Sequence, residues 1–184
     1  MAGERLDRAP GEGTEFDAVV RAALREFVDD LARIVWLTKE LDCVNRFVFR
    51  HLAPRVCPGG PLRDLGQIRI EGNAPQPPGI GRKLSARKDL VLWADPDATC
   101  FADPNGDGRW QAPHRPLAIM EWKADLRARH RPRLDAHDLE WLGAAARHWL
   151  GFVGYAVLLH RDVLLAARCA GDNWDREWLT LPRR

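Results

Sequence analysis

The feature of this sequence that most constrains its fold is a short apolar run that contains two charged side chains. The run extends from Pro116 to Ala124 and includes Glu121, Trp122 and Lys123. Residues two apart on a strand point to the same face, so Glu121 and Lys123 share one face and Trp122 points away. Charged groups are rare in apolar strands unless they are paired or bind a metal. The run therefore predicts a buried strand with a charged site on one face.

A second apolar run, from Asp89 to Trp93, opens with a single acid upstream of the first. An acid on one strand and an acid-x-lysine pattern on a neighbouring strand are what a metal-dependent phosphodiesterase needs. The lysine is itself informative, because the 28 Lys and Arg residues of the chain include only four lysines. Lysine presents a compact ammonium group and changes its pKa on burial, whereas arginine does neither. Lys123 is therefore a specific choice in a chain whose basic residues are mostly arginine.

The composition is that of a globular domain. The chain has 184 residues, of which 46% are hydrophobic and 29% charged, and this length predicts one domain with a sizeable core. The net charge of +2 does not by itself indicate nucleic-acid binding. The four cysteines form no C-x-x-C pair, and no signal peptide or membrane span is recognisable, so we expect a cytoplasmic protein.

Helical and strand patterns follow one another along the chain. Residues 1–13 are predicted to be a flexible tail, and residues 14–184 a single domain. Thr14 and Asp17 resemble a capping box that begins a helix with an apolar stripe from Phe16 to Val35. A second helical pattern has an apolar face from Leu41 to Leu52, and either Thr38 caps it or the two stretches run on as one helix. A later helix is expected to begin at residues 135–138 and to end at Gly151. Strands are expected at residues 67–71, 88–94, 116–124, 155–160, 163–169 and 177–181. This order predicts an α/β fold in which one mixed central sheet is flanked by helices.

These patterns resemble the PD-(D/E)XK nuclease superfamily, which has the restriction-endonuclease-like fold. Its core runs helix, three-stranded meander, helix, strand (αβββαβ), and here it is preceded by an N-terminal helical extension. Asp89 matches the family's first acid, and Glu121 and Lys123 match its (D/E)-x-K motif. The resemblance covers roughly residues 38–160, and one departure is that Lys88, rather than proline, precedes Asp89.

The resemblance implies further site residues. Family members often add a glutamate from the helix before the first strand, and Glu40 is our choice for it, with Glu26 as the alternative. Magnesium, for which Mn²⁺ can substitute, prefers oxygen ligands such as the carboxylates of Asp89 and Glu121, and the family pattern adds the main-chain carbonyl of Trp122. Such a metal neutralises developing charge and acidifies a water, which then acts as the nucleophile. Lys123 would orient or deprotonate that water, or stabilise the charge on phosphorus; the sequence leaves these roles open.

Basic residues surround the acidic positions in the sequence. Two short segments lie before Asp89 and after Lys123, where a polyanionic backbone would have to pass. We expect them to contact phosphates rather than bases. The residues concerned are Arg87, Lys88, Arg127, Arg129, Arg131 and Arg133.

The sequence thus predicts a Mg²⁺-dependent phosphodiesterase, an endonuclease-type hydrolase that cleaves nucleic acid, with DNA as the expected substrate. The alternative is a catalytically silent nucleic-acid-binding or protein-interaction module on the same fold. RNA as a substrate, single-stranded substrates and a homodimer stay open. The N-terminal amphipathic helix is where a dimer interface is expected.

Overall fold

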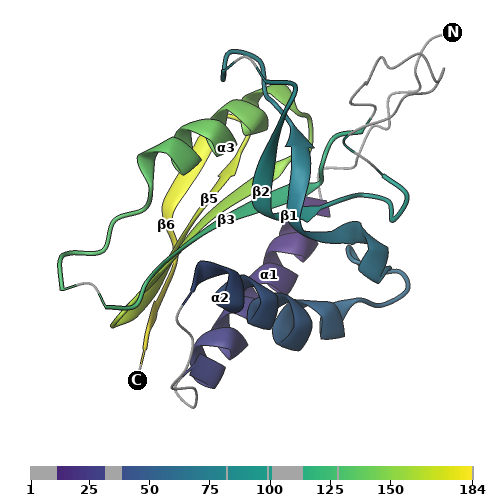
Figure 1. Ribbon diagram of the computed structural model, residues 1–184. Coiled ribbons are helices and arrows are strands. Elements are labelled where there is room, and N and C mark those ends of the chain that lie inside the picture. The colour runs from purple at the N-terminus through teal and green to yellow at the C-terminus, as the bar shows by residue number, and fades with distance from the viewer. Residues whose placement is uncertain are drawn as a thin grey trace, which may run out of the picture.

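The computed structural model describes residues 12–31, 39–81, 83–98, 100, 114–127 and 129–183 (Figure 1). Of the predicted tail, only Glu12 and Gly13 are described, and both belong to helix α1 (Glu12–Leu31). Because α1 begins at Glu12, Thr14 lies within the helix and is not its N-cap. Asp17, the other half of the predicted capping box, is instead held by the sheet: its Oδ1 accepts hydrogen bonds from the Tyr155 hydroxyl (2.6 Å) and the Arg168 guanidinium (2.7 Å).

The second predicted helix is present but changes its winding. It begins as α2 (Glu40–Arg46) and continues as a π-helical turn, η1 (Phe47–Leu52). A short 3₁₀ turn, η2 (Ala53–Arg55), then ends it at Pro54, where the missing amide hydrogen prevents a regular helix from continuing. A further 3₁₀ turn, η3 (Leu65–Gln67), leads into the sheet.

The sheet has six strands in sequence order. Only β3 and β4 pair in parallel, because helix α3 (Ala136–His148) connects them, and the other neighbouring strands are antiparallel. All eight residues of β4 are buried, as expected for a strand with both faces covered. The strands are β1 (Ile68–Pro75), β2 (Ser85–Leu92), β3 (Ala118–Asp125), β4 (Val153–His160), β5 (Val163–Ala170) and β6 (Asn173–Pro182).

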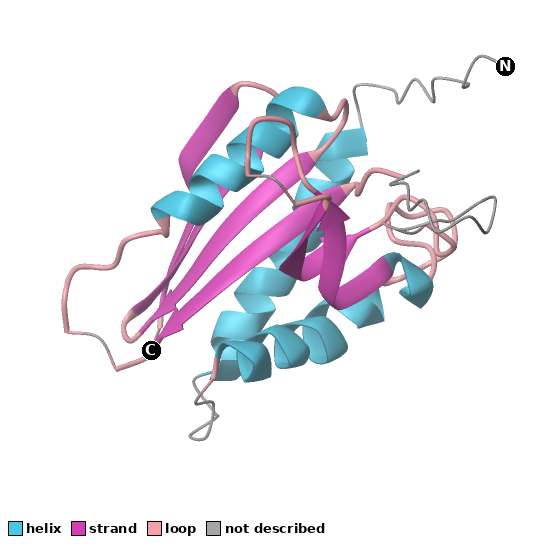
Figure 2. Ribbon diagram, turned by 45° about the horizontal axis from the view of Figure 1, so that its top comes forward, coloured by secondary structure: helices cyan, strands magenta, loops and turns pink. Residues whose placement is uncertain are grey.

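Helices cover both faces of the sheet (Figures 1 and 2). Helices α1 and α2 pack on one face, where Phe27, Phe47 and Trp122 form mutual ring contacts with centroids 5.1 to 5.9 Å apart. Helix α3 packs on the other, where Trp141 lies in a separate cluster with Ile119. Strand β3 thus sends alternate side chains into two cores, as its sequence predicts. The predicted α/β class with a mixed, helix-flanked sheet is confirmed.

Helix α1 packs onto its own sheet. Its apolar face, which includes Phe16, Leu24 and Phe27, is buried in the same cluster as Trp122 and Tyr155. The reason for expecting a dimer interface on this helix is therefore removed. Among the described residues, no helix is both long and apolar enough to cross a membrane.

Candidate nuclease-type site

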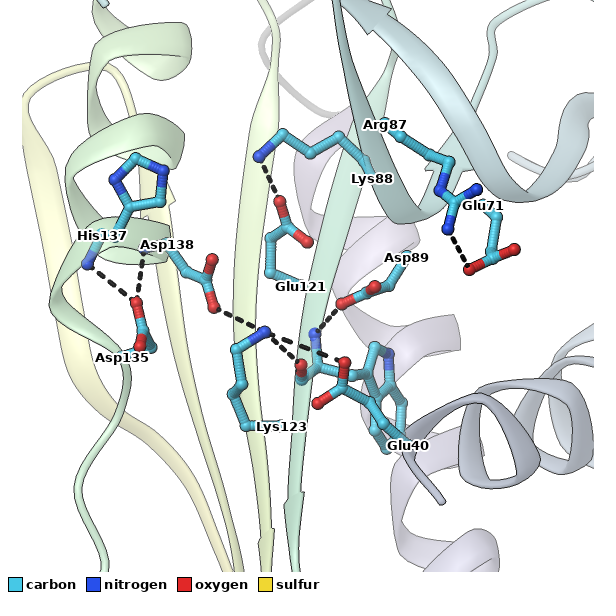
Figure 3. A network of polar contacts seen from close by, with 11 residues as sticks. Glu40, Glu71, Arg87, Lys88, Asp89, Glu121, Lys123, Asp135, His137 and Asp138 are labelled. Atoms are coloured by element: carbon cyan, nitrogen blue, oxygen red, sulfur yellow. Dashed lines mark hydrogen bonds and ion pairs between the residues drawn. The ribbon is translucent and has the colours of Figure 1, made fainter.

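Asp89 lies where strand β2 departs from regular pairing. The pairing of β2 with β3 reaches Leu90 opposite Met120, and beyond it the Trp122 amide donates to Oδ2 of Asp89 at 2.7 Å (Figure 3). On the other side of β2, Glu71 has a φ of 50°, which is uncommon for a residue other than glycine and marks a local distortion of the strand. The Asp89 carboxylate therefore takes the place of a backbone acceptor and is fixed against β3.

Glu121 is buried in the centre of the site, with 5% of its surface exposed. Its carboxylate forms an ion pair with the Lys88 ammonium, which in turn lies 3.9 Å from the centre of the Trp141 ring. Burial raises the pKa of Glu121 to about 7, against the lowering effect of Lys88, and the neighbouring carboxylates of Asp89 and Asp138 add to the rise. Glu121 is thus an acid whose charged form is costly without a cation beside it.

Lys123 is half-exposed and contacts three oxygen groups (Figure 3). Its Nζ lies 3.3 Å from Oδ2 of Asp138 and 3.8 Å from Oε1 of Glu40, and it donates to the Trp122 carbonyl at 2.9 Å. Burial acts to lower the pKa of Lys123, but the carboxylates of Asp138, Glu40 and Asp89 outweigh it and leave the pKa above its ordinary value. In this arrangement the side chain is an ammonium ion.

Glu40, the first residue of α2, is the helix acid that the fold brings to Lys123. Burial raises the pKa of Glu40, while the Lys123 charge opposes the rise. Glu26, the alternative, lies in a different cluster on α1, where its carboxylate is 2.6 Å from the Arg55 guanidinium. The structure therefore groups Glu40, and not Glu26, with Asp89, Glu121 and Lys123.

Asp138 is the site residue that the sequence did not reveal. It lies in the first turn of α3, and Asp135 caps that turn by accepting hydrogen bonds from the amides of His137 (2.9 Å) and Asp138 (3.1 Å). Burial raises the pKa of Asp138, and the Lys123 charge opposes the rise. An acid in a first helical turn usually interacts with the helix dipole. The sequence contains one signal for the role of Asp138. Asp135 already caps the helix, so the Asp138 side chain is available to another partner.

The predicted phosphate-contacting residues separate into two groups. Lys88 is buried, with 6% of its surface exposed, so it lies inside the site rather than on a surface that a nucleic-acid backbone could reach. Arg87 is exposed and pairs with Glu71 at 3.1 Å. The other four are exposed on the connection between β3 and α3: Arg127, Arg129, Arg131 and Arg133.

The oxygen groups of the site suit a hard divalent cation. Asp89 is fixed by the Trp122 amide, and its charge acts on both Glu121 and Glu40, so the three carboxylates lie within electrostatic range of one another. Magnesium needs only one or two carboxylates, with water and carbonyl oxygens completing its coordination. No ready cluster of three or more His, Cys, Asp or Glu side chains at metal-binding distances occurs in the described part of the chain. The donor types present, carboxylate and carbonyl oxygens, are those that magnesium takes.

Comparison of the chain with protein families, curated proteins and solved structures finds no match.

Proposed function

We propose that the protein is a Mg²⁺-dependent nuclease that hydrolyses phosphodiester bonds, with DNA as the expected substrate. The observation that carries the proposal is that Asp89, Glu121, Lys123 and Glu40, from β2, β3 and α2, lie in one network beside the Trp122 main chain. The order helix, three-stranded meander, helix and parallel strand supports it, because that order is the restriction-endonuclease-like core of the PD-(D/E)XK nucleases. All four cysteines are free thiols, which suits a reducing cytoplasm.

Each site residue has a defined part in this proposal. Asp89, Glu121 and the Trp122 carbonyl would hold the metal, which supplies charge neutralisation and an acidified water. Asp138 and Glu40 keep Lys123 protonated. Lys123 therefore orients the attacking water or stabilises the negative charge on the phosphoryl oxygens, and it does not serve as the base. A positioned cation of this kind is worth about 100-fold or more in rate.

The proposal is tested by cleavage of single- and double-stranded DNA and RNA with Mg²⁺, Mn²⁺ or EDTA. The parent protein is compared with Asp89→Asn and Lys123→Met, which keep side-chain size while removing charge. We expect metal-dependent cleavage that each substitution lowers by about 100-fold or more. Circular dichroism of each variant confirms that it is folded.

Three results would count against the proposal. Cleavage that survives both substitutions indicates a contaminant or another site. Cleavage that persists in EDTA excludes the metal-dependent chemistry. A parent protein that binds DNA but cleaves none of the substrates supports the silent binding module instead.

A further inference from the structure

Lys88 is a buried cation at the centre of the candidate site. Its side chain is 6% exposed, and its ammonium forms an ion pair with Oε1 of Glu121. On its other side it lies 3.9 Å from the centre of the Trp141 ring, a distance typical of a cation–π contact. Few lysines in proteins are buried to this extent unless they are paired.

The surroundings of Lys88 hold it in place. Trp141 is 1% exposed, and its indole Nε1 donates to Oε1 of Gln76 at 3.3 Å, which fixes the ring that faces the ammonium. Glu121 is equally buried, so neither member of the ion pair can turn to solvent without leaving the other buried and uncompensated. Separating a buried pair of this kind is strongly unfavourable, so the pair is expected to persist.

The Lys88 charge acts on two carboxylates, those of Glu121 on β3 and Asp138 on α3. Two-metal phosphodiesterases place a second divalent ion about 3.5–4 Å from the first, held by carboxylates that the two ions share. In this chain the Lys88 ammonium is ion-paired with Glu121, a carboxylate that two such ions would share. A cation that belongs to the protein therefore already compensates this shared carboxylate.

The charge of the site agrees with this assignment. The four carboxylates of Glu40, Asp89, Glu121 and Asp138, together with the ammonium groups of Lys88 and Lys123, leave two negative charges when all are ionised. One divalent ion balances them, and a second would leave an excess of positive charge. Without Lys88 the site would carry three negative charges, and a single divalent ion would leave one of them uncompensated.

We propose that Lys88 is a fixed cation that compensates Glu121 in place of a second metal ion, so that each chain binds a single divalent ion. The inference rests on the proposed function for the identity of the metal ligands, and it deepens that proposal by setting the metal stoichiometry. Lys88 is a positioning residue that acts through Glu121.

The test is the number of Mn²⁺ ions bound per chain, measured by electron paramagnetic resonance of free Mn²⁺ at slightly alkaline pH. We expect one ion for the parent protein and two for Lys88→Met, which keeps the apolar stem against Trp141 but removes the charge. If Lys88→Met does not fold, Lys88→Gln serves as a second variant, because the glutamine amide can still donate to Glu121. Lys83→Met, the same change at an exposed lysine, is expected to bind one ion.

The outcomes separate the inference from the proposed function. Two ions in the parent, or only one ion in both Lys88 variants, would overturn the role of Lys88 while leaving a metal-dependent nuclease intact. No Mn²⁺ binding by the parent would overturn both. Cleavage by the parent, measured separately, reports on the proposed function alone.

Discussion

At the scale of single residues, the site is a set of acids and lysines that compensate one another. Lys123 lies between the carboxylates of Glu40 and Asp138, and Lys88 faces Glu121. Burial raises the pKa of each of these three acids, and the nearby lysine charge opposes the rise in each case. Perturbed pKa values of this kind, gathered in one cluster, mark a candidate functional site.

Glu40 and Glu26 provide a matched pair for testing which helix acid takes part. We expect Glu40→Gln to lower metal-dependent cleavage about 10- to 100-fold, because it removes a carboxylate that positions Lys123. Glu26→Gln should stay within about twofold of the parent, because its exposed ion pair with Arg55 contributes little and lies outside the site. Initial rates on the same DNA substrate give the comparison, and equal losses in the two variants would contradict it.

The raised pKa of Glu121 predicts a pH-dependent stability. The folded-state pKa is about 7 and the ordinary value is 4.5, so between these values the folded chain holds a proton that the unfolded chain has released. The contribution of Glu121 to the free energy of unfolding is therefore fully present below pH 4.5 and is lost as the pH rises to about 7. The loss amounts to about 3 kcal/mol.

The measurement for this effect is urea unfolding in EDTA at several pH values, with Glu121→Gln as the reference. The glutamine cannot titrate, so its own contribution does not change with pH. The free energy of unfolding of the parent should therefore fall relative to that of Glu121→Gln as the pH rises through this window. A difference that stays constant with pH would show that Glu121 remains ionised throughout, as it would if Lys88 compensated its burial fully.

At the scale of elements, regular patterns could be predicted from the sequence and irregular ones could not. The six strands and the helices were found in order, because apolar alternation and helical spacing are local signals. The π-helical turn at Phe47–Leu52 carries no such signal. Strict alternation would also place Lys88 on the same face as Leu90, whereas its ammonium reaches Trp141 on the opposite face.

The same limit explains which part of the site was missed. Asp89, Glu121 and Lys123 are recognisable because they interrupt apolar strands, which is visible in the sequence alone. Asp138 joins them only because α3 crosses back over the sheet to connect two parallel strands. Its contact with Lys123 is a property of tertiary packing, and no spacing along the chain contains it.

The packing of α3 on the sheet depends on a glycine in β4. A Cβ at Gly154 would lie 2.6 Å from the Cys169 sulfur and 3.0 Å from Cβ of Leu142 on α3. We expect Gly154→Ala to lower the free energy of unfolding by about 1–3 kcal/mol and to displace α3. Since Asp138 lies one turn before Leu142, cleavage should fall as well.

A compensating variant sharpens this prediction. Cys169→Ala removes the sulfur that the new methyl group would meet, so Gly154→Ala/Cys169→Ala should recover part of the stability lost in Gly154→Ala. Urea unfolding and cleavage rates are measured on the same samples. If Gly154→Ala alone were as stable as the parent, α3 and β5 would be able to move away from the new methyl group without a loss in the free energy of unfolding.

At the scale of the whole molecule, the arginine-rich connection leads from one side of the site to the other. It leaves β3 at Asp125, two residues after Lys123, and enters α3 at Ala136, two residues before Asp138. The ends of the connection are therefore held together by the Lys123–Asp138 contact of 3.3 Å. A net charge of only +2 makes this local concentration of arginine the expected source of nucleic-acid affinity.

The salt dependence of DNA binding tests this placement. Each phosphate contact adds about 0.9 to the slope of log affinity against log salt concentration for duplex DNA. Arg131→Ala/Arg133→Ala should therefore lower the slope by about 1.8, measured by fluorescence anisotropy in EDTA from about 50 to about 200 mM salt. Arg25→Ala/Arg50→Ala removes the same charge from exposed positions on α1 and η1. If both pairs lowered the slope equally, overall charge would govern binding; a loss confined to Arg131 and Arg133 would mean that the DNA backbone follows this connection into the site.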